Sequence, residues 1–128
     1  HPQAVEDVTL EEYDLVMQLN LTTALQVTQA CIPTMKRQKF GRIVNIASEH
    51  ALGMVPKRTT YGATKAGLIN FAREWTLDLA PHGITANVVA PGPIETDMLL
   101  KNNPHNSPQR RDLLMRVPVR VIDEAPKL

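Results

Sequence analysis

Hydrophobic positions recur at helical spacing through the first third of the chain. Residues 9–12 (TLEE) fit a capping box, in which a hydroxyl covers a free backbone N–H and the glutamate three residues later reaches back. Asn20 falls on the apolar stripe that follows, and the helix can continue toward residue 36, with Pro33 as a point where it can kink. The other members of the stripe are apolar or small: Val16, Ala24, Val27 and Cys31.

Two runs of β-branched residues predict strands, and a second helical pattern separates them. Residues 41–48 (GRIVNIAS) form the first run and residues 85–90 (TANVVA) the second. Between them we expect a loop over residues 49–58 and a helix over residues 59–80. The order helix, strand, helix, strand predicts two parallel strands joined by a right-handed crossover.

The region after the second strand is polar. Asn and Pro crowd together over residues 98–116. Such a stretch is typical of a mobile loop or of two short helices, and the sequence leaves both alternatives open.

Composition places the chain among ordinary folded domains. Hydrophobic residues make up 43% and charged residues 21%, and the net charge is +1 with scattered basic residues, so nothing favours nucleic acid or an acidic membrane surface as a partner. No apolar run reaches the ~18 residues of a membrane span. Cys31 is the single cysteine, which fits a reducing, cytoplasmic location, and His1, His82 and His105 lack metal-ligand spacing.

Candidate chemistry begins with Tyr61 and Lys65, which stand four apart on the second predicted helix and so share one face. Alone, such a pair is typical of many helix surfaces. Ser48 closes the first strand, and open α/β sheets bind ligands beyond the carboxyl ends of their strands. The turn at residues 91–96 (PGPIET) follows the second strand at that same end, and Asn20 is an amide that needs partners on an apolar stripe.

Taken together, these motifs resemble the short-chain dehydrogenase/reductase family of the single-domain kind. The resemblance rests on the spacing from Ser48 to residues 61–65 (YGATK), on the strand text at residues 42–46 (RIVNI), on residues 87–92 (NVVAPG) with TDM after them, and on the helix carrying Asn20 and Leu21. It runs from about residue 8 to 100. The implied fold is α/β, a Rossmann-like doubly wound parallel sheet, present here as an incomplete portion with two strands and long flanking helices.

The resemblance implies an NAD(P)-dependent oxidoreductase that moves a hydride between NAD or NADP and a small alcohol or carbonyl substrate. Tyr61 would be the general acid/base, Lys65 its electrostatic partner, Ser48 the group that polarises the carbonyl, and Asn20 the holder of a water in a proton relay. A phenol has an unperturbed pKa of ~10, so work near neutral pH requires ~4 kcal/mol of phenolate stabilisation, of the sign that an ammonium supplies. The implied cofactor contacts are Tyr61, Lys65, Pro91, Gly92, Ile94 and Thr96.

Each of these residues also has an ordinary structural explanation. Ser48 could simply cap a strand, Asn20 could satisfy a helix kink near its own turn, and Thr96 could be the N-cap of the next short helix. Glu49 and His50 could touch substrate or could be exposed loop residues.

The chain departs from the family pattern at both ends. It contains no glycine-rich phosphate turn after a first strand, and the last strand of the family fold is expected beyond Leu128. We therefore expect residues 1–128 to be the catalytic portion of a single-domain Rossmann-fold dehydrogenase. We also expect the isolated chain to be inactive, and to be aggregation-prone, partly molten or ordered only by association, because two strands leave unpaired sheet edges and uncovered helix faces.

Competing functions remain open at this point. A non-catalytic remnant or interaction module could keep these residues and lack cofactor binding. A serine hydrolase based on Ser48 is disfavoured, because no Gly-x-Ser-x-Gly elbow surrounds that residue. The resemblance also implies a homodimer or homotetramer, and it leaves the substrate and the choice between NAD and NADP open.

Overall fold

The computed structural model describes residues 3–53, 55–116 and 123–124. The chain divides into two compact units, a first unit of residues 1–90 and a second unit of residues 91–128. None of the described helices is both long and apolar enough to cross a membrane.

The first long helix has three parts. After a short 3-10 turn, η1 (Val5–Asp7), it begins as α1 (Leu10–Met17), opens into the π-helical turn η2 (Gln18–Thr22) and continues as α2 (Thr23–Gln38). Pro33 lies inside α2, but the break in the α-helical hydrogen-bond pattern comes earlier, at η2.

Thr9 begins this helix as predicted. Its hydroxyl accepts a hydrogen bond from the Glu12 backbone N–H at 3.2 Å. The glutamate reaches back to Thr9, as the capping box predicts. Its carboxylate accepts from Gln3 Nε2 at 2.6 Å and from the Thr9 hydroxyl at 3.1 Å, and these two bonds, the first above all, hold the pKa of Glu12 below its ordinary value.

The predicted apolar stripe is only partly right. Val16, Asn20 and Ala24 are partly buried, as expected, but Val27 and Cys31 are exposed. A π-turn contains one more residue than an α-turn, so η2 shifts the phase of the positions that follow it. The inward-facing positions beyond Ala24 are Thr28, Ile32 and Met35.

The predicted parallel pair is present. β1 (Gly41–Ile46) and β2 (Ile84–Val89) pair in parallel from Gly41↔Ile84 to Ile46↔Val89. Each of the two strands differs slightly from its predicted range, and β1 ends two residues before Ser48. The connection consists of η3 (Glu49–Ala51), α3 (Thr59–Leu79) and η4 (Ala80–His82).

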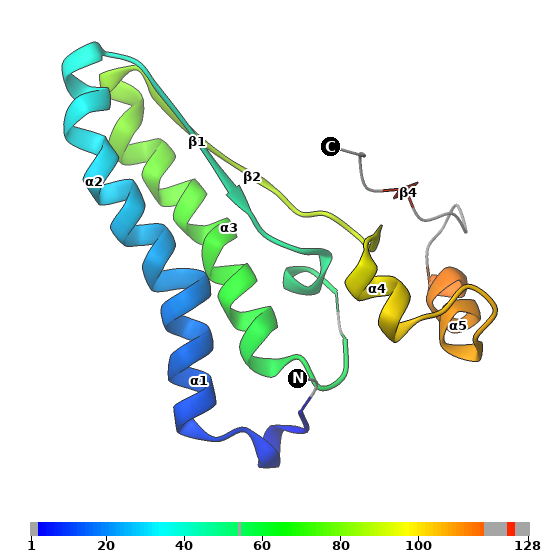
Figure 1. The fold of residues 1–128 in the computed structure, drawn as a ribbon. Coiled ribbons are helices and arrows are strands. Elements are labelled where there is room, and N and C mark those ends of the chain that lie inside the picture. The colour runs from blue at the N-terminus through cyan, green and yellow to red at the C-terminus, as the bar shows by residue number, and fades with distance from the viewer. Residues whose placement is uncertain (1–2, 54, 117–122, 125–128) are drawn as a thin grey trace. The chain divides into compact units, whose positions relative to one another are not determined.

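One face of the β1–β2 sheet is packed and the other is open. α2 and α3 run along the packed face (Figure 1). Along β1 buried and exposed residues alternate, because successive side chains point to opposite faces, and the buried ones lie on the packed face. Asn45 on β1 also donates a hydrogen bond to the Leu68 carbonyl of α3 at 3.1 Å. The core cluster on this face contains Ile43, Leu79, Ile84 and Ala86, with Ile32, Met35 and Trp75 packed against it.

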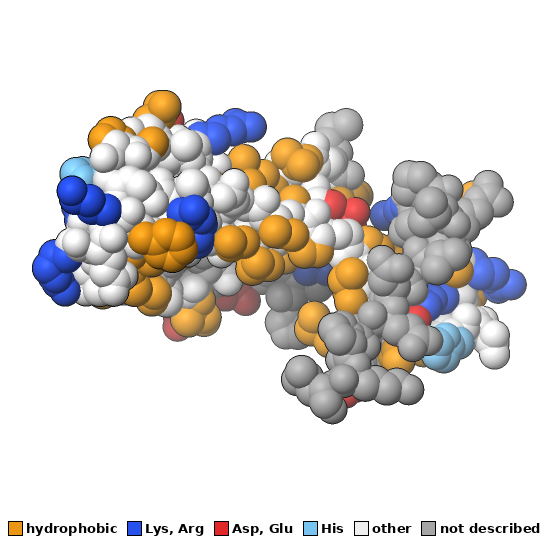
Figure 2. Space-filling model, turned by 90° about the horizontal axis from the view of Figure 1, so that it is seen from above, with side chains coloured by type: hydrophobic (Ala, Val, Ile, Leu, Met, Phe, Trp, Pro, Cys, Tyr) orange, Lys and Arg blue, Asp and Glu red, His pale blue; other side chains and the backbone are white. Residues whose placement is uncertain are grey.

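The open face carries hydrophobic side chains of the same kinds. Val44, Ile46 and Val89 are between 50% and 55% exposed. Figure 2 shows solvent-exposed hydrophobic side chains, in orange, on the face of the molecule that it presents. The expectation that the isolated chain aggregates remains a prediction, and these side chains supply a physical reason for it.

Gly83 forms the tight turn that leads into β2. Its φ is 73°, in the left-handed region, and a Cβ placed there would lie 2.3 Å from the Lys39 carbonyl oxygen. Only glycine fits this turn without strain, because every other residue would meet both the backbone penalty and the clash.

The second unit contains two short helices, which confirms one of the two alternatives for residues 98–116. These are α4 (Asp97–Asn102) and α5 (Pro108–Arg116). The sequence did not predict β3 (Ile94–Glu95) and β4 (Asp123–Glu124), which pair in parallel with each other. A pair of two-residue strands is too short to produce a periodic pattern in the sequence.

Candidate active site

Tyr61 and Lys65 lie on one face near the start of α3, as their spacing predicted. The Lys65 ammonium nitrogen is 5.7 Å from the centre of the Tyr61 ring. It donates a hydrogen bond to the carbonyl of Ile46 at 2.8 Å, and Ile46 is the last residue of β1. This bond holds a positive charge at the carboxyl end of the sheet and beside the phenol.

Ser48 is buried, at 7% exposure, two residues beyond β1. Its hydroxyl oxygen accepts from the His50 backbone N–H at 3.3 Å and so caps η3, the turn after β1, rather than the strand itself. The same oxygen lies 3.2 Å from His50 Nδ1. Capping uses a lone pair of the oxygen, and the hydroxyl can still act as a donor.

His50 connects Ser48 to the helix that carries the tyrosine. Its ring meets the Tyr61 ring edge-on, with 5.6 Å between the centroids. α3 passes close to this loop, since a Cβ on Gly62 would lie 3.3 Å from the His50 carbonyl oxygen. Ser48 and Tyr61 each contact His50, and Lys65 lies beside the Tyr61 ring.

Asn20 reaches the same helix from η2. Its amide nitrogen donates to the Thr64 hydroxyl at 3.3 Å, and that hydroxyl donates to the Tyr61 backbone carbonyl at 2.8 Å. The predicted polar network around Asn20 is thus present, and its bond goes to α3 rather than to its own turn. Sequence reasoning missed Thr64, although a hydroxyl residue lying between Tyr61 and Lys65 could have indicated it.

Two openings give access to these side chains. A cavity of about 310 Å³ is lined by Tyr61 and Asn20, among others. A groove of about 480 Å³ along α2 and β1 is lined by Lys65 and again by Asn20. Asn20 thus stands in the wall of both, where water or a small molecule can reach it.

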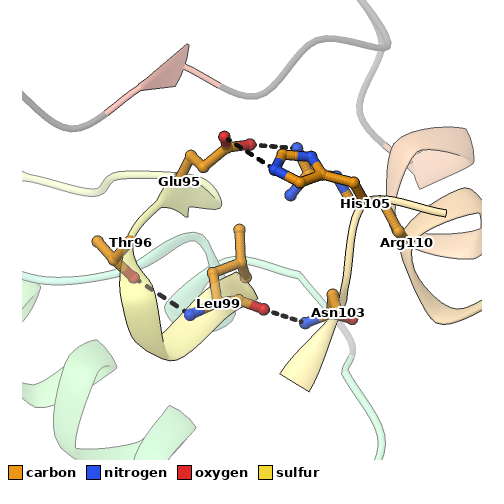
Figure 3. A network of polar contacts seen from close by, with 6 residues as sticks. All are labelled: Glu95, Thr96, Leu99, Asn103, His105 and Arg110. Atoms are coloured by element: carbon orange, nitrogen blue, oxygen red, sulfur yellow. Dashed lines mark hydrogen bonds and ion pairs between the residues drawn. The ribbon is translucent and has the colours of Figure 1, made fainter. Parts of the chain in front are cut away.

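The four predicted cofactor residues of the turn after β2 belong to the second unit. Pro91 and Gly92 precede β3, Ile94 lies in β3, and Thr96 follows it. Thr96 is the N-cap of α4, since its hydroxyl accepts from the Leu99 backbone N–H at 3.3 Å (Figure 3). The structural explanation is therefore correct for Thr96, and its cofactor role remains a prediction.

An ion pair inside the second unit joins β3 to α5. Arg110 is buried, at 7% exposure, and its Nη2 pairs with the Glu95 carboxylate, while His105 Nε2 lies 3.9 Å from that carboxylate (Figure 3). Arg110 Nη1 is buried and has no hydrogen-bond partner among the residues that the structure describes. Across the part of the chain that the structure describes, no three His, Cys, Asp or Glu side chains are placed to hold a metal ion.

Comparison with known protein families tests whether this chain belongs to the family that the motifs indicate. The family model described as short chain dehydrogenase matches residues 1–107, which is most of the chain. This chain belongs to the short-chain dehydrogenase family. The family prediction made from the YGATK motif and the two strands is confirmed.

Individual relatives support the same conclusion. The chain is 37% identical over 101 residues to the D-beta-hydroxybutyrate dehydrogenase of Cupriavidus necator, covering 79% of this chain and 39% of that protein. It is 38% identical over 115 residues to the 3-oxoacyl-[acyl-carrier-protein] reductase of Haemophilus influenzae, covering 90% of this chain and 46% of that protein.

A solved structure confirms the Rossmann-like fold. A gluconate 5-dehydrogenase from Burkholderia cenocepacia J2315, in complex with NADP and tartrate, superposes with a TM-score of 0.89 at 26% identity. The match covers 97% of this chain and 48% of that one. The short-chain dehydrogenase described here therefore spans less than half the length of each of these three proteins.

Proposed function

We propose that this chain is the catalytic portion of an NAD- or NADP-dependent oxidoreductase that interconverts a small alcohol and the corresponding carbonyl compound. The observation that carries the proposal is the position of Lys65, whose ammonium is held at the end of β1 by the Ile46 carbonyl and lies beside the ring of Tyr61. Ser48 stands at the same strand end. Family membership supports the reaction class.

Tyr61 is the proposed general acid/base. In the reducing direction its hydroxyl gives a proton to the carbonyl oxygen, and in the oxidising direction the phenolate removes the proton of the alcohol. The Lys65 ammonium nitrogen lies 5.7 Å from the centre of the Tyr61 ring, beside the reacting group. Ser48 donates a hydrogen bond from its hydroxyl to the same substrate oxygen, where negative charge develops during reduction, and keeps its own proton.

The donor set at Lys65 fits a nicotinamide dinucleotide. An ammonium has three N–H donors, and the Ile46 carbonyl takes one of them, which leaves two for the hydroxyls of a ribose. By family resemblance Tyr61 shares this contact, and Pro91, Gly92, Ile94 and Thr96 contact the nicotinamide. When bound, the nicotinamide supplies or accepts the hydride.

Replacing Tyr61 by Phe in the full-length protein is the direct test. We expect kcat to fall by about 10³-fold, since the acid/base group is lost, while the affinity for NAD(P)H falls by at most about tenfold, the loss expected for one hydrogen bond to the ribose. Turnover is followed by nicotinamide absorbance on a panel that includes D-β-hydroxybutyrate and a 3-oxoacyl compound, because the names of the two curated relatives contain these groups. Cofactor affinity is measured by fluorescence titration.

The chain offers a matched control in Tyr13, its second tyrosine, which is exposed on α1. Tyr13→Phe removes an equivalent hydroxyl and should leave kcat unchanged. Activity retained in Tyr61→Phe would refute the assigned role. If the full-length protein binds neither NADH nor NADPH, the alternative of a non-catalytic interaction module is favoured.

We further propose that the protein is cytoplasmic and works as a homodimer or homotetramer, both by family resemblance. The single cysteine, Cys31, suits a reducing compartment. Leu15 and Leu19 on the first helix and Leu77 on α3 are large apolar side chains that are more than half exposed, as expected of surfaces that pair with another subunit. Light scattering of the full-length protein tests the assembly, and cell fractionation tests the location.

A further inference from the structure

We propose that His50 is a positioning residue that controls the direction of the Ser48 hydroxyl proton. When Nδ1 of His50 carries a proton, it donates to the Ser48 oxygen, and the hydroxyl proton of the serine is left for the oxygen of the substrate. The inference rests on the proposed function and deepens it, because Ser48 assists the proposed reaction only as a hydrogen-bond donor.

The Ser48 hydroxyl makes two polar contacts among the described residues, and His50 supplies both of them. The backbone N–H of His50 lies 3.3 Å from the hydroxyl oxygen and can only donate to it. Nδ1 of the same residue lies 3.2 Å from that oxygen, and this contact can run in either direction. A neutral imidazole carries its proton on one nitrogen and accepts on the other, so the tautomer decides which of the two groups donates.

The two tautomers have opposite consequences for the serine. If the ring proton is on Nε2, the Ser48 hydroxyl donates to Nδ1, and donation to a substrate first costs this bond. If Nδ1 bears the proton, the oxygen accepts from both N–H groups of His50, and its own proton can only be donated elsewhere. Hydrogen bonds in a chain polarise one another, so an oxygen that accepts two bonds is also a stronger donor. Only the second arrangement suits the proposed role of Ser48.

Packing restrains the imidazole where it makes this contact. His50 is partly buried, and its ring meets the Tyr61 ring at 86° with 5.6 Å between the centroids. α3 also approaches the backbone of His50 closely, since a Cβ on Gly62 would lie 3.3 Å from the His50 carbonyl oxygen. Ser48 is only 7% exposed, so little water competes for its hydroxyl. The helix that carries the proposed acid/base therefore also restrains the ring that contacts the serine.

The position of the ring proton can be measured directly. We expect Nδ1 of His50 to carry a proton in the full-length protein with NADH or NADPH bound. Nuclear magnetic resonance of the protein labelled at its histidine ring nitrogens measures this, and the signals of His50 are those that disappear in His50→Asn. A proton-free Nδ1 would overturn the proposal, whatever the activities of the variants.

His50→Phe is the kinetic test, because it keeps an aromatic ring against Tyr61 and the backbone N–H of residue 50 but removes Nδ1. We expect kcat of the full-length protein to fall about tenfold, the loss expected for one hydrogen bond, with the KM for cofactor changed less than about twofold. His50→Asn should restore most of this loss, since its carboxamide can place an N–H donor near the position of Nδ1. A His50→Asn variant no more active than His50→Phe would contradict the proposal.

His82 offers a matched control. It is the last residue of η4, the turn that leads to the amino end of β2, and His82→Phe should leave kcat unchanged. His50→Leu serves as a second variant without Nδ1 in case the phenylalanine prevents folding. If neither of these two variants folds, the resonance measurement decides the proposal.

A double-mutant cycle with Ser48→Ala separates positioning of the serine from a direct contact of His50 with substrate or with Tyr61. If His50 acts through Ser48, adding His50→Phe to Ser48→Ala lowers kcat no further. Losses that multiply would overturn the proposal. An unchanged or raised kcat in His50→Phe alone would also overturn it, because Nδ1 would then be an acceptor that holds the serine proton back.

These outcomes are distinct from failure of the proposed function. An active Tyr61→Phe would overturn the proposed reaction and, with it, the role of His50 in that reaction. An inactive Tyr61→Phe combined with a fully active His50→Phe would leave the reaction in place and reject only the positioning role.

Discussion

Ser48 and Thr96 perform the same local task in the two units. Each follows a strand, and each accepts a backbone N–H at 3.3 Å to cap the helix that comes next. Their surroundings differ. Ser48 is buried, and its neighbour His50 contacts the ring of Tyr61, whereas Thr96 is exposed and its side chain bonds within its own helix. A capping hydroxyl becomes a candidate for catalysis only when distant segments gather around it.

The charged groups show the same contrast. In the first unit the Lys65 ammonium bonds to a strand carbonyl 19 residues away, where the charge faces no carboxylate among the ion pairs of the described residues. In the second unit the buried Arg110 pairs with Glu95, a carboxylate of the same unit. The first arrangement is the one that the proposed ligand role requires, and the second neutralises a buried charge within its own unit.

The largest effect is expected for the ion pair between Arg110 and Glu95 in the second unit, whose stabilising role can be tested by mutation. Glu95→Gln leaves the Arg110 guanidinium buried without its carboxylate, and we expect the free energy of opening of α5 to fall by about 3–5 kcal/mol. Hydrogen exchange of the α5 amides in the full-length protein measures it. Asp112→Asn is the control, because its pair with Arg116 is exposed and should contribute less than about 1 kcal/mol. Equal effects of the two variants would contradict this interpretation.

Next in size is the loss of the Ser48 hydroxyl. Ser48→Ala should lower kcat about 10²- to 10³-fold, because a donor to the developing oxyanion is lost, with cofactor affinity nearly unchanged. Ser107→Ala is the matched control, since the Ser107 hydroxyl caps the backbone N–H of Arg110 at 3.1 Å in the second unit. A similar loss of activity in both variants would show that capping, rather than catalysis, explains Ser48.

The smallest effect is expected at Thr96. Thr96→Ala should cost about 1 kcal/mol in α4 stability, because the cap is lost, and should raise the KM for cofactor several-fold with little change in kcat. Thr96→Ser should restore both, and steady-state kinetics with hydrogen exchange of α4 measures them. A kcat loss as large as that of Ser48→Ala would break the contrast between the two residues.

Several elements were predictable because their signals are local. The cap at Thr9, the parallel order of β1 and β2 and the extent of α3 follow from side-chain chemistry and periodicity over a few residues. The assignment of Val27 to the inward stripe was wrong, because η2 shifts the helical phase, and no nearby residue type indicates a π-turn.

The sequence by itself determined the family, through motifs that lie at fixed spacings along the chain. It also determined the shared face of Tyr61 and Lys65, because the rise and turn of an α-helix place residues four apart together whatever surrounds them. Only the tertiary structure decided that His50 contacts both Ser48 and the ring of Tyr61, and that Asn20 bonds to Thr64. These contacts depend on how closely η2, η3 and β1 approach α3. That approach is set by packing between distant segments, for which the local pattern of residues carries no signal.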